Sequence, residues 1–115
     1  MKRSFYVAGV QFRPKEDIAK AVKEMKVGDQ LILDPEPTNR FDPNAVKILR
    51  GDDFLGYVPK KFSSEVSALL SIGAPVVCTV DEVNPAAKTY EMFKVTVSIP
   101  VEEEIPELEN DGLED

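Results

Sequence analysis

Two apolar runs are joined by Glu36-Pro37-Thr38-Asn39-Arg40-Phe41-Asp42-Pro43-Asn44-Ala45-Val46-Lys47, and Gly56-Tyr57-Val58-Pro59 begins nine residues later. The joining loop concentrates Asn, Asp and Pro around a single aromatic residue, Phe41. Binding residues are concentrated in loops that a rigid scaffold holds in place. This loop is therefore the first candidate for a functional site, and the segments around it should form the scaffold.

The flanking segments have the composition of β-strands. Residues 5–12 are rich in aromatic and β-branched residues and contain Gly9, which predicts a first strand with a bend at the glycine. Five more short apolar segments are bounded by turn-forming residues: 31–33, 45–49, 54–58, 76–83 and 90–97. The turn at residues 51–53 makes 45–58 a hairpin.

Two segments have helical spacing instead. In residues 17–26 the apolar side chains fall at i, i+4 and i+7, on one face of a short helix. A second helix is predicted from Pro59 to about residue 72, because Pro favours the start of a helix and Gly73 its end. The fold class is therefore mainly β with two short helices, a small six-stranded OB-like or SH3-like β-barrel.

The charge divides the chain into two parts. The 115 residues carry a net charge of −7, but eight of the 21 acidic residues and no basic residue lie in residues 102–115. This leaves 13 acidic against 14 basic residues, a net charge of +1, in residues 1–101. We expect a barrel domain over 1–101 and an acidic tail over 102–115, which can compete with an anionic ligand for the module's cations.

Composition also limits the chemistry. The chain has no histidine and one cysteine, Cys78, so an imidazole base, a cysteine–histidine pair and an internal disulfide are all absent. We expect Cys78 to be a small buried residue, since basic neighbours that would activate a thiol are missing. We expect no enzymatic activity, no metal, no cofactor, no signal peptide and no membrane span, and a cytoplasmic location.

Two aromatic residues have alternative roles. Phe12 ends the predicted first strand, and Phe41 lies between Arg40 and Asp42. Both rings could pack, Phe12 at the barrel mouth and Phe41 as a lid over it, which is the more common role of an aromatic side chain. Alternatively, the two rings could sandwich a nucleobase.

The loop, the Gly56-Tyr57-Val58-Pro59 string and the opening Phe5-Tyr6-Val7-Ala8-Gly9-Val10 resemble the HIRAN domain family over about residues 5–99. These small β-barrel modules occur at the head of helicase-like fork-remodelling proteins and as short stand-alone bacterial and phage proteins. The resemblance implies capture of the 3′-OH end of single-stranded DNA in DNA repair, replication-fork processing or recombination, and it implies single-stranded DNA and other DNA-processing proteins as partners.

The resemblance also assigns roles to individual residues. It implies that Phe12 and Phe41 stack on terminal bases, where the family usually has tyrosines, and that Asp42 accepts a hydrogen bond from the terminal hydroxyl. A carboxylate there repels a 3′-phosphate and so selects a free 3′-OH. Asn39 supports the loop and the terminal nucleotide. Tyr57 lines the ligand, and Tyr90 matches a further aromatic residue near the pocket.

Phosphate groups need their own contacts. The main chain at Ala8 and Gly9 can approach a ligand closely because glycine has no side chain. Lys60 and Lys61 open the second helix, whose amino-terminal N–H groups favour an anion, and the resemblance gives Lys60 a phosphate contact. Gln11 stands where DNA-binding members often have arginine, which removes a cation and should weaken binding.

Two other functions are compatible with the sequence. A small barrel with an aromatic mouth can serve as a protein–protein interaction module. Asp34, Glu36 and Asp42 lie within nine residues and could bind Mg²⁺ in a nuclease, although two prolines interrupt their spacing.

Overall fold

The computed structural model describes residues 1–100, so the predicted acidic tail of residues 102–115 lies outside the described part. In chain order the elements are β1 (Lys2–Tyr6), η1 (Val10–Phe12), α1 (Lys15–Glu24), β2 (Gln30–Pro35), β3 (Val46–Arg50), β4 (Asp53–Tyr57), α2 (Lys60–Ser71), β5 (Val77–Val83), η2 (Thr89–Glu91) and β6 (Phe93–Ser98). The predicted class, mainly β with six strands and two short helices, is confirmed.

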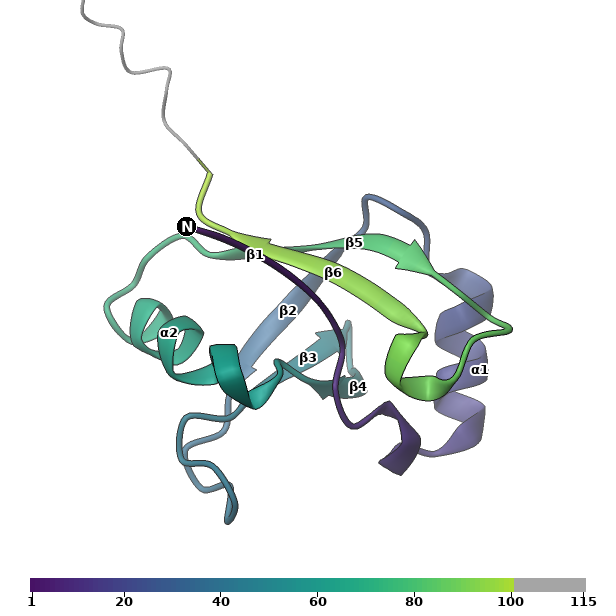
Figure 1. Cartoon of the computed structure of the whole chain (residues 1–115), viewed down its shortest axis with the longest axis horizontal. Coiled ribbons are helices and arrows are strands. Elements are labelled where there is room, and N and C mark those ends of the chain that lie inside the picture. The colour runs from purple at the N-terminus through teal and green to yellow at the C-terminus, as the bar shows by residue number, and fades with distance from the viewer. Residues whose placement is uncertain (101–115) are drawn as a thin grey trace, which may run out of the picture.

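The six strands form one curled antiparallel sheet in the order β1-β6-β5-β2-β3-β4. The two helices lie at opposite sides of this half-barrel, and the loop between β2 and β3 projects away from it (Figure 1). The predicted hairpin is present as β3 and β4, which pair across the turn at Gly51.

The curl brings the two edges of the sheet into contact. The main chain of Ala8, just after β1, exchanges two hydrogen bonds with Tyr57 at the end of β4, with N···O distances of 2.9 and 2.7 Å. Gly56 permits this approach. A Cβ atom at residue 56 would lie 2.3 Å from the Ala8 carbonyl oxygen and 2.7 Å from Val7 Cγ1, distances that no side chain tolerates.

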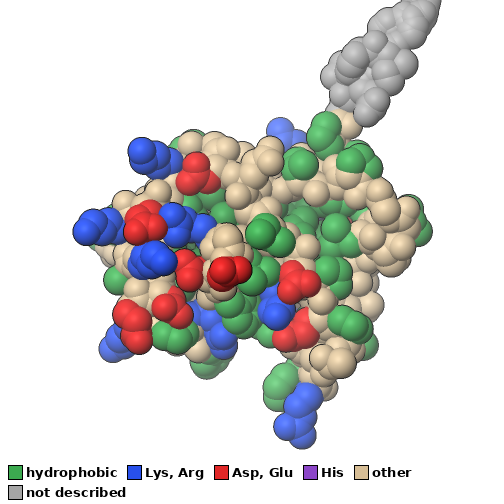
Figure 2. Space-filling model, turned by 180° about the vertical axis from the view of Figure 1, so that it is seen from behind, with side chains coloured by type: hydrophobic (Ala, Val, Ile, Leu, Met, Phe, Trp, Pro, Cys, Tyr) green, Lys and Arg blue, Asp and Glu red, His purple; other side chains and the backbone are tan. Residues whose placement is uncertain are grey.

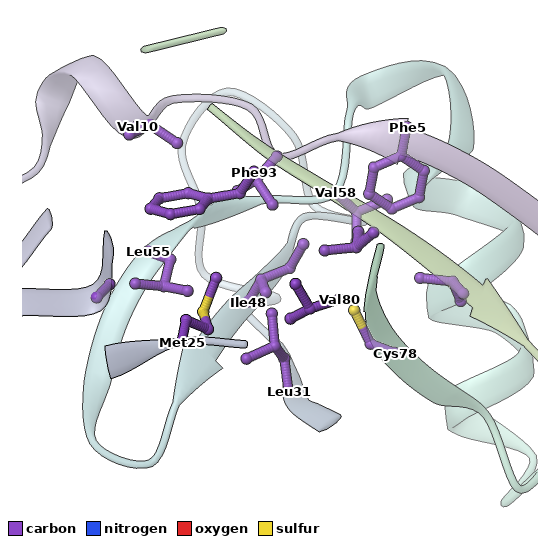
Figure 3. Packing of buried hydrophobic residues seen from close by; sticks show 14 of the residues in the cluster. Phe5, Val10, Met25, Leu31, Ile48, Leu55, Val58, Cys78, Val80 and Phe93 are labelled. Atoms are coloured by element: carbon purple, nitrogen blue, oxygen red, sulfur yellow. The ribbon is translucent and has the colours of Figure 1, made fainter. Parts of the chain in front are cut away.

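The interior of the curl is a continuous apolar core (Figure 3). Phe93, Ile48 and Leu55 are fully buried, and α1 and α2 add Ile18 and Val66 to them. Burial of such side chains contributes about 1.5–3 kcal/mol each to the stability of a fold. This core holds the strands that position the loop, and it leaves the loop itself outside.

Cys78 belongs to the same core. Its side chain is buried, and the loss of solvation raises the pKa of the thiol to about 12. A thiol with such a pKa stays protonated at neutral pH, so it behaves as a small apolar residue. The prediction of a small buried cysteine is confirmed.

Two predicted strands have different limits in the structure. β1 ends at Tyr6, and Gly9, with a φ of 78°, turns the chain into the short 3₁₀ helix η1, so Phe12 lies outside any strand. The predicted bend at Gly9 is correct, but the strand does not continue beyond it. Likewise, Tyr90 lies in η2, and β6 begins only at Phe93.

Within residues 1–100, none of the helices has the length and apolarity required to cross a membrane.

Candidate nucleic-acid interface

A groove of about 640 Å³ opens where η1, the β2–β3 loop, the end of β4 and the start of α2 meet. Eight of the ten candidate residues line it: Ala8, Gly9, Phe12, Asn39, Phe41, Asp42, Tyr57 and Lys60. These residues come from three separate parts of the sequence. The fold therefore assembles most of the predicted site in one place, because sheet closure brings η1 beside the loop.

Asn39 organises the loop from within. Its side-chain oxygen accepts hydrogen bonds from the main-chain N–H groups of Phe41 and Asp42, at 2.9 and 3.0 Å. Its side-chain nitrogen donates to Glu36 Oε1 at 2.8 Å and to the Tyr57 hydroxyl at 3.3 Å. An Asn side chain used in this way fixes a turn. The structural support predicted for Asn39 is present, and the side chain is already fully engaged within the protein.

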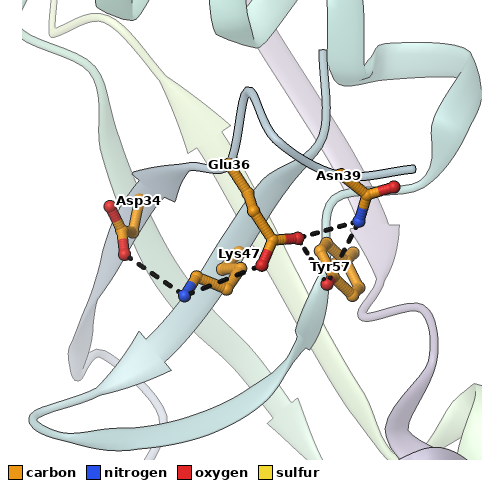
Figure 4. Close-up of polar contacts among 5 residues, drawn as sticks. All are labelled: Asp34, Glu36, Asn39, Lys47 and Tyr57. Atoms are coloured by element: carbon orange, nitrogen blue, oxygen red, sulfur yellow. Dashed lines mark hydrogen bonds and ion pairs between the residues drawn. The ribbon is translucent and has the colours of Figure 1, made fainter. Parts of the chain in front are cut away.

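Glu36 connects the loop to the sheet (Figure 4). Its carboxylate accepts hydrogen bonds from Asn39 and from the Tyr57 hydroxyl, the latter at 2.7 Å, and Lys47 Nζ lies 3.9 Å from it. The hydrogen bonds from Asn39 and Tyr57 hold the pKa of Glu36 below its ordinary value. Burial and the Glu36 contact raise the pKa of Tyr57, so the phenol keeps its proton and remains the donor.

Asp42 is fixed from two directions. Ser63, the one buried polar residue of the described core, donates its hydroxyl to Asp42 Oδ2 at 2.7 Å. The main-chain N–H of Asn44 donates to Oδ1 at 2.8 Å, which makes Asp42-Pro43-Asn44 a turn closed by the aspartate side chain. These two donors hold the pKa of Asp42 below its ordinary value. The carboxylate lines the groove and is ionised at neutral pH, as an aspartate with an ordinary pKa also is.

The aromatic side chains Phe12 and Phe41 stand open to solvent. Phe12 is 73% exposed and Phe41 is 88% exposed, and both line the groove. The alternative that Phe12 packs at the barrel mouth and Phe41 covers it is therefore wrong. Exposed aromatic rings in a groove leave apolar and π surface open to solvent, and such surface can stack on a planar ligand.

The main chain near Gly9 is only partly available. Both hydrogen-bonding groups of Ala8 are used by Tyr57 in closing the sheet, so the expected phosphate contact from Ala8 N–H is not possible in this structure. Gly9 turns the chain at the groove, and a Cβ atom there would lie 3.6 Å from the Tyr57 ring. The main chain of Ala8 thus serves contacts within the protein, whereas a phosphate contact at Gly9 stays a prediction.

Three expected contacts fall outside the groove. Gln11 lines a second groove on the other side of η1, and Tyr90 lines neither. Lys61 lies with its ammonium group 5.0 Å from the centre of the Phe62 ring and lines neither groove, whereas Lys60 lines the first. Residues that are adjacent in the sequence are expected to share a site, but within η1 and α2 adjacent side chains point in different directions.

Sequence reasoning missed two contributors. Ser63 supports Asp42 from below, and its only sequence signal was a polar residue close to the start of an amphipathic helix. Arg13 lines the groove and supplies a cation two residues after Gln11. This segment therefore brings a cation to the first groove through Arg13, while Gln11 lines only the second.

The three carboxylates considered for Mg²⁺ do not form a common site. Asp34 lies 3.7 Å from Lys47, Glu36 is held by Asn39 and Tyr57, and Asp42 is held by Ser63. Among residues 1–100, no three carboxylate or cysteine side chains gather in a group that could hold a metal ion.

Cationic and anionic side chains are mixed on the face shown in Figure 2, with hydrophobic side chains between them and no broad region of one sign. A near-neutral surface of this kind gives little general attraction for a polyanion. The face shown in Figure 2 therefore offers no broad basic surface to a polyanion.

A small curled β-barrel with a preorganised loop, two exposed rings and a fixed carboxylate defines a ligand-binding module. The HIRAN domain family model matches residues 3–102, and the chain therefore belongs to the HIRAN domain family, a family of DNA-binding modules.

Two solved structures share the fold. The HIRAN domain of human HLTF superposes with a TM-score of 0.59 at 14% identity, over 84% of this chain and 70% of that chain. A protein from Lactobacillus plantarum superposes with a TM-score of 0.70 at 17% identity, over 84% and 95% of the two chains. A comparison with curated proteins found no match.

Proposed function

We propose that this chain captures the 3′-OH end of single-stranded DNA, in the cytoplasm, as part of DNA repair, replication-fork processing or recombination. The observation that carries the proposal is the common groove of Phe12, Phe41 and Asp42. Two exposed rings offer faces on which bases stack at about 1–3 kcal/mol per base. The ionised carboxylate in the same groove accepts a hydrogen bond from a hydroxyl.

The same carboxylate accounts for end selection. A strand that continues beyond this point, or ends in a 3′-phosphate, would bring a second anion next to Asp42. Asp42 is ionised at neutral pH, and the hydrogen bonds from Ser63 and Asn44 orient the carboxylate and retain its charge, and so the repulsion of a phosphate, to a lower pH. Binding is thereby directed to strands with a free hydroxyl.

Three oligonucleotides of one sequence test the proposal: one with a 3′-OH, one with a 3′-phosphate, and one circular strand without an end. Fluorescence anisotropy should give tightest binding for the 3′-OH strand and much weaker binding for the other two. Equal affinity for all three strands would contradict the proposal that the groove captures a 3′ end. Binding of none of them would favour the alternative that the groove takes a protein partner.

A further inference from the structure

Arg13 is a cation without a partner in the described part of the chain. None of the carboxylates in residues 1–100 lies within salt-bridge distance of it, and no hydrogen bond from its guanidinium to these residues is present. Glu36, whose pKa its charge helps to lower, is engaged by Asn39, Tyr57 and Lys47. The charge of Arg13 thus remains available to a ligand.

The guanidinium is nevertheless held in place. Its central carbon lies 4.2 Å from the centre of the Phe54 ring, and Phe54 in turn meets Tyr57 edge to face at 5.2 Å. Nε is buried and has no hydrogen-bond acceptor within residues 1–100. The two terminal nitrogens also make no hydrogen bond to these residues, but they are not buried and so can reach a ligand. Stacking on an aromatic face while presenting a planar edge is characteristic of arginine at phosphate-binding sites.

Arg13 also occupies a boundary. It lines the first groove together with Phe12 and Asp42, and it lines the second groove, of about 550 Å³, together with Gln11 and Lys15. A strand whose terminal bases occupy the first groove must carry its next phosphate out past one rim of that groove. Arg13 offers a fixed cation at the rim shared with the second groove.

We propose that Arg13, held by Phe54, binds one backbone phosphodiester of the captured strand at the boundary between the two grooves. This proposal rests on the proposed function for the identity of the ligand. Arginine can donate two parallel hydrogen bonds from its terminal nitrogens to two phosphate oxygens. Such a pair of bonds orients the strand as well as strengthening its binding. The contact is specific to one linkage.

A neutral-linkage scan tests the contact. The probes are hexathymidylates with a 3′-OH, each carrying a single methylphosphonate at a different linkage, and the readout is the Kd from fluorescence anisotropy. For the wild-type protein one linkage should be the most sensitive, with a loss of about tenfold or more. Arg13→Gln should bind the unmodified strand about as weakly as the wild-type protein binds the strand neutralised at that linkage. In this variant, neutralising the same linkage should cause no further loss of affinity.

Matched variants separate charge, geometry and folding. Lys26→Gln removes an exposed cation that lines neither groove and should leave the scan unchanged. Phe54→Leu keeps the charge of Arg13 but removes the ring on which its guanidinium stacks. The loss of affinity on neutralising the sensitive linkage should therefore be smaller than in the wild-type protein, but still measurable. Arg13→Lys should restore part of it, because an ammonium group makes a point contact only. The scan compares linkages within one variant, so a general loss of affinity does not imitate the result.

Two outcomes overturn the proposal: full affinity in Arg13→Gln, or additive losses at every linkage. The test remains separate from end capture, since wild-type protein that binds 3′-OH and 3′-phosphate strands equally would contradict end capture while the scan still decides the Arg13 contact. Absence of any binding by the wild-type protein overturns both.

Discussion

The groove rings Phe12 and Phe41 are the residues whose removal should affect binding without affecting the fold. Both side chains are mostly exposed, so truncation leaves no cavity in the core. Phe12→Ala and Phe41→Ala should each weaken binding of a 3′-OH strand by about 1–3 kcal/mol, roughly 5- to 150-fold, because one stacking surface is lost.

The melting temperatures of these two variants provide the check. Both should stay close to that of the wild-type protein. A Phe12 at the end of a core strand, where the sequence places it, leads to the expectation of some loss of stability in Phe12→Ala. Its position in η1 and its exposure replace that expectation. A clear drop in melting temperature for either variant would show that the ring packs in solution.

Asp42 should show a pH dependence controlled by Ser63. Hydrogen bonds from Ser63 and Asn44 lower the pKa of Asp42, so the ionised form is retained to a lower pH than in an unfolded chain. Any stabilisation from these bonds is present above the unfolded pKa and is lost as pH falls through the folded pKa. The preference for a 3′-OH should disappear over the same interval.

Ser63→Ala should move the Asp42 titration to higher pH, followed by NMR of the side-chain carboxyl carbon. Ser64→Ala, which changes an exposed neighbour on the same helix, should leave it unmoved. An Asp42 titration that is the same in Ser63→Ala and wild type would mean that the Ser63 contact does not support the carboxylate.

At the scale of elements, the closure between the end of β1 and β4 determines the geometry of the site. Gly56→Ala should destabilise the protein by at least about 1–3 kcal/mol, because its Cβ would overlap the Ala8 carbonyl oxygen. DNA binding should weaken together with stability, since Ala8, Gly9 and Tyr57 line the groove. Chemical denaturation measures the first effect.

Gly51→Asn is the matched control. Gly51 also has a positive φ, 58°, but a Cβ there meets nothing within 4 Å, and Asn tolerates this conformation. This variant should be close to neutral. Similar losses in both variants would attribute the effect to backbone conformation in general and would remove the special role of the closure.

The elements themselves could largely be predicted from sequence. Turn residues and apolar periodicity located α2 within one residue at each end, and they located the β3–β4 hairpin. η1 was missed because Val10 and Phe12 favour a strand, while the positive φ of Gly9 and the pairing of Ala8 with Tyr57 redirect the chain. Such tertiary pairing leaves no local signal.

At the scale of the whole molecule, the charge distribution predicts weak dependence on salt. Residues 1–101 carry a net charge of +1, and Arg13 and Lys60 are the basic residues lining the first groove. Contacts with about two or three phosphates give a log–log slope near −2 for a single strand. A slope steeper than about −5 would require a broad basic surface, contrary to the mixed charges of Figure 2.

Truncation after Val101 extends this prediction. It removes eight carboxylates that can compete with phosphate for the same cations, so affinity for a 3′-OH strand should rise, most of all at low salt. Affinity that is unchanged across salt concentrations would leave the acidic segment without a regulatory role.

The site could be predicted in part because its residues are concentrated in three short segments of the sequence, 8–12, 39–42 and 57–60. Eight of ten candidates meet in one groove. Ser63 and Arg13 could not be assigned from sequence, since their roles come from contacts across the fold, with Asp42 and with Phe54. Gln11 and Tyr90 fail for the same reason, because side-chain direction depends on η1 and η2.

Selection of the free hydroxyl by Asp42 is tested most directly by one ratio, the Kd for a 3′-phosphate strand divided by the Kd for a 3′-OH strand. This ratio is measured for the wild-type protein and for Asp42→Asn. Asn keeps the size and the turn-forming ability of Asp but removes the negative charge. The wild-type protein should prefer the 3′-OH strand by about tenfold or more, and Asp42→Asn should bring the ratio close to one. A wild-type ratio of one, or a full preference retained in Asp42→Asn, would contradict the claim that Asp42 selects the free hydroxyl.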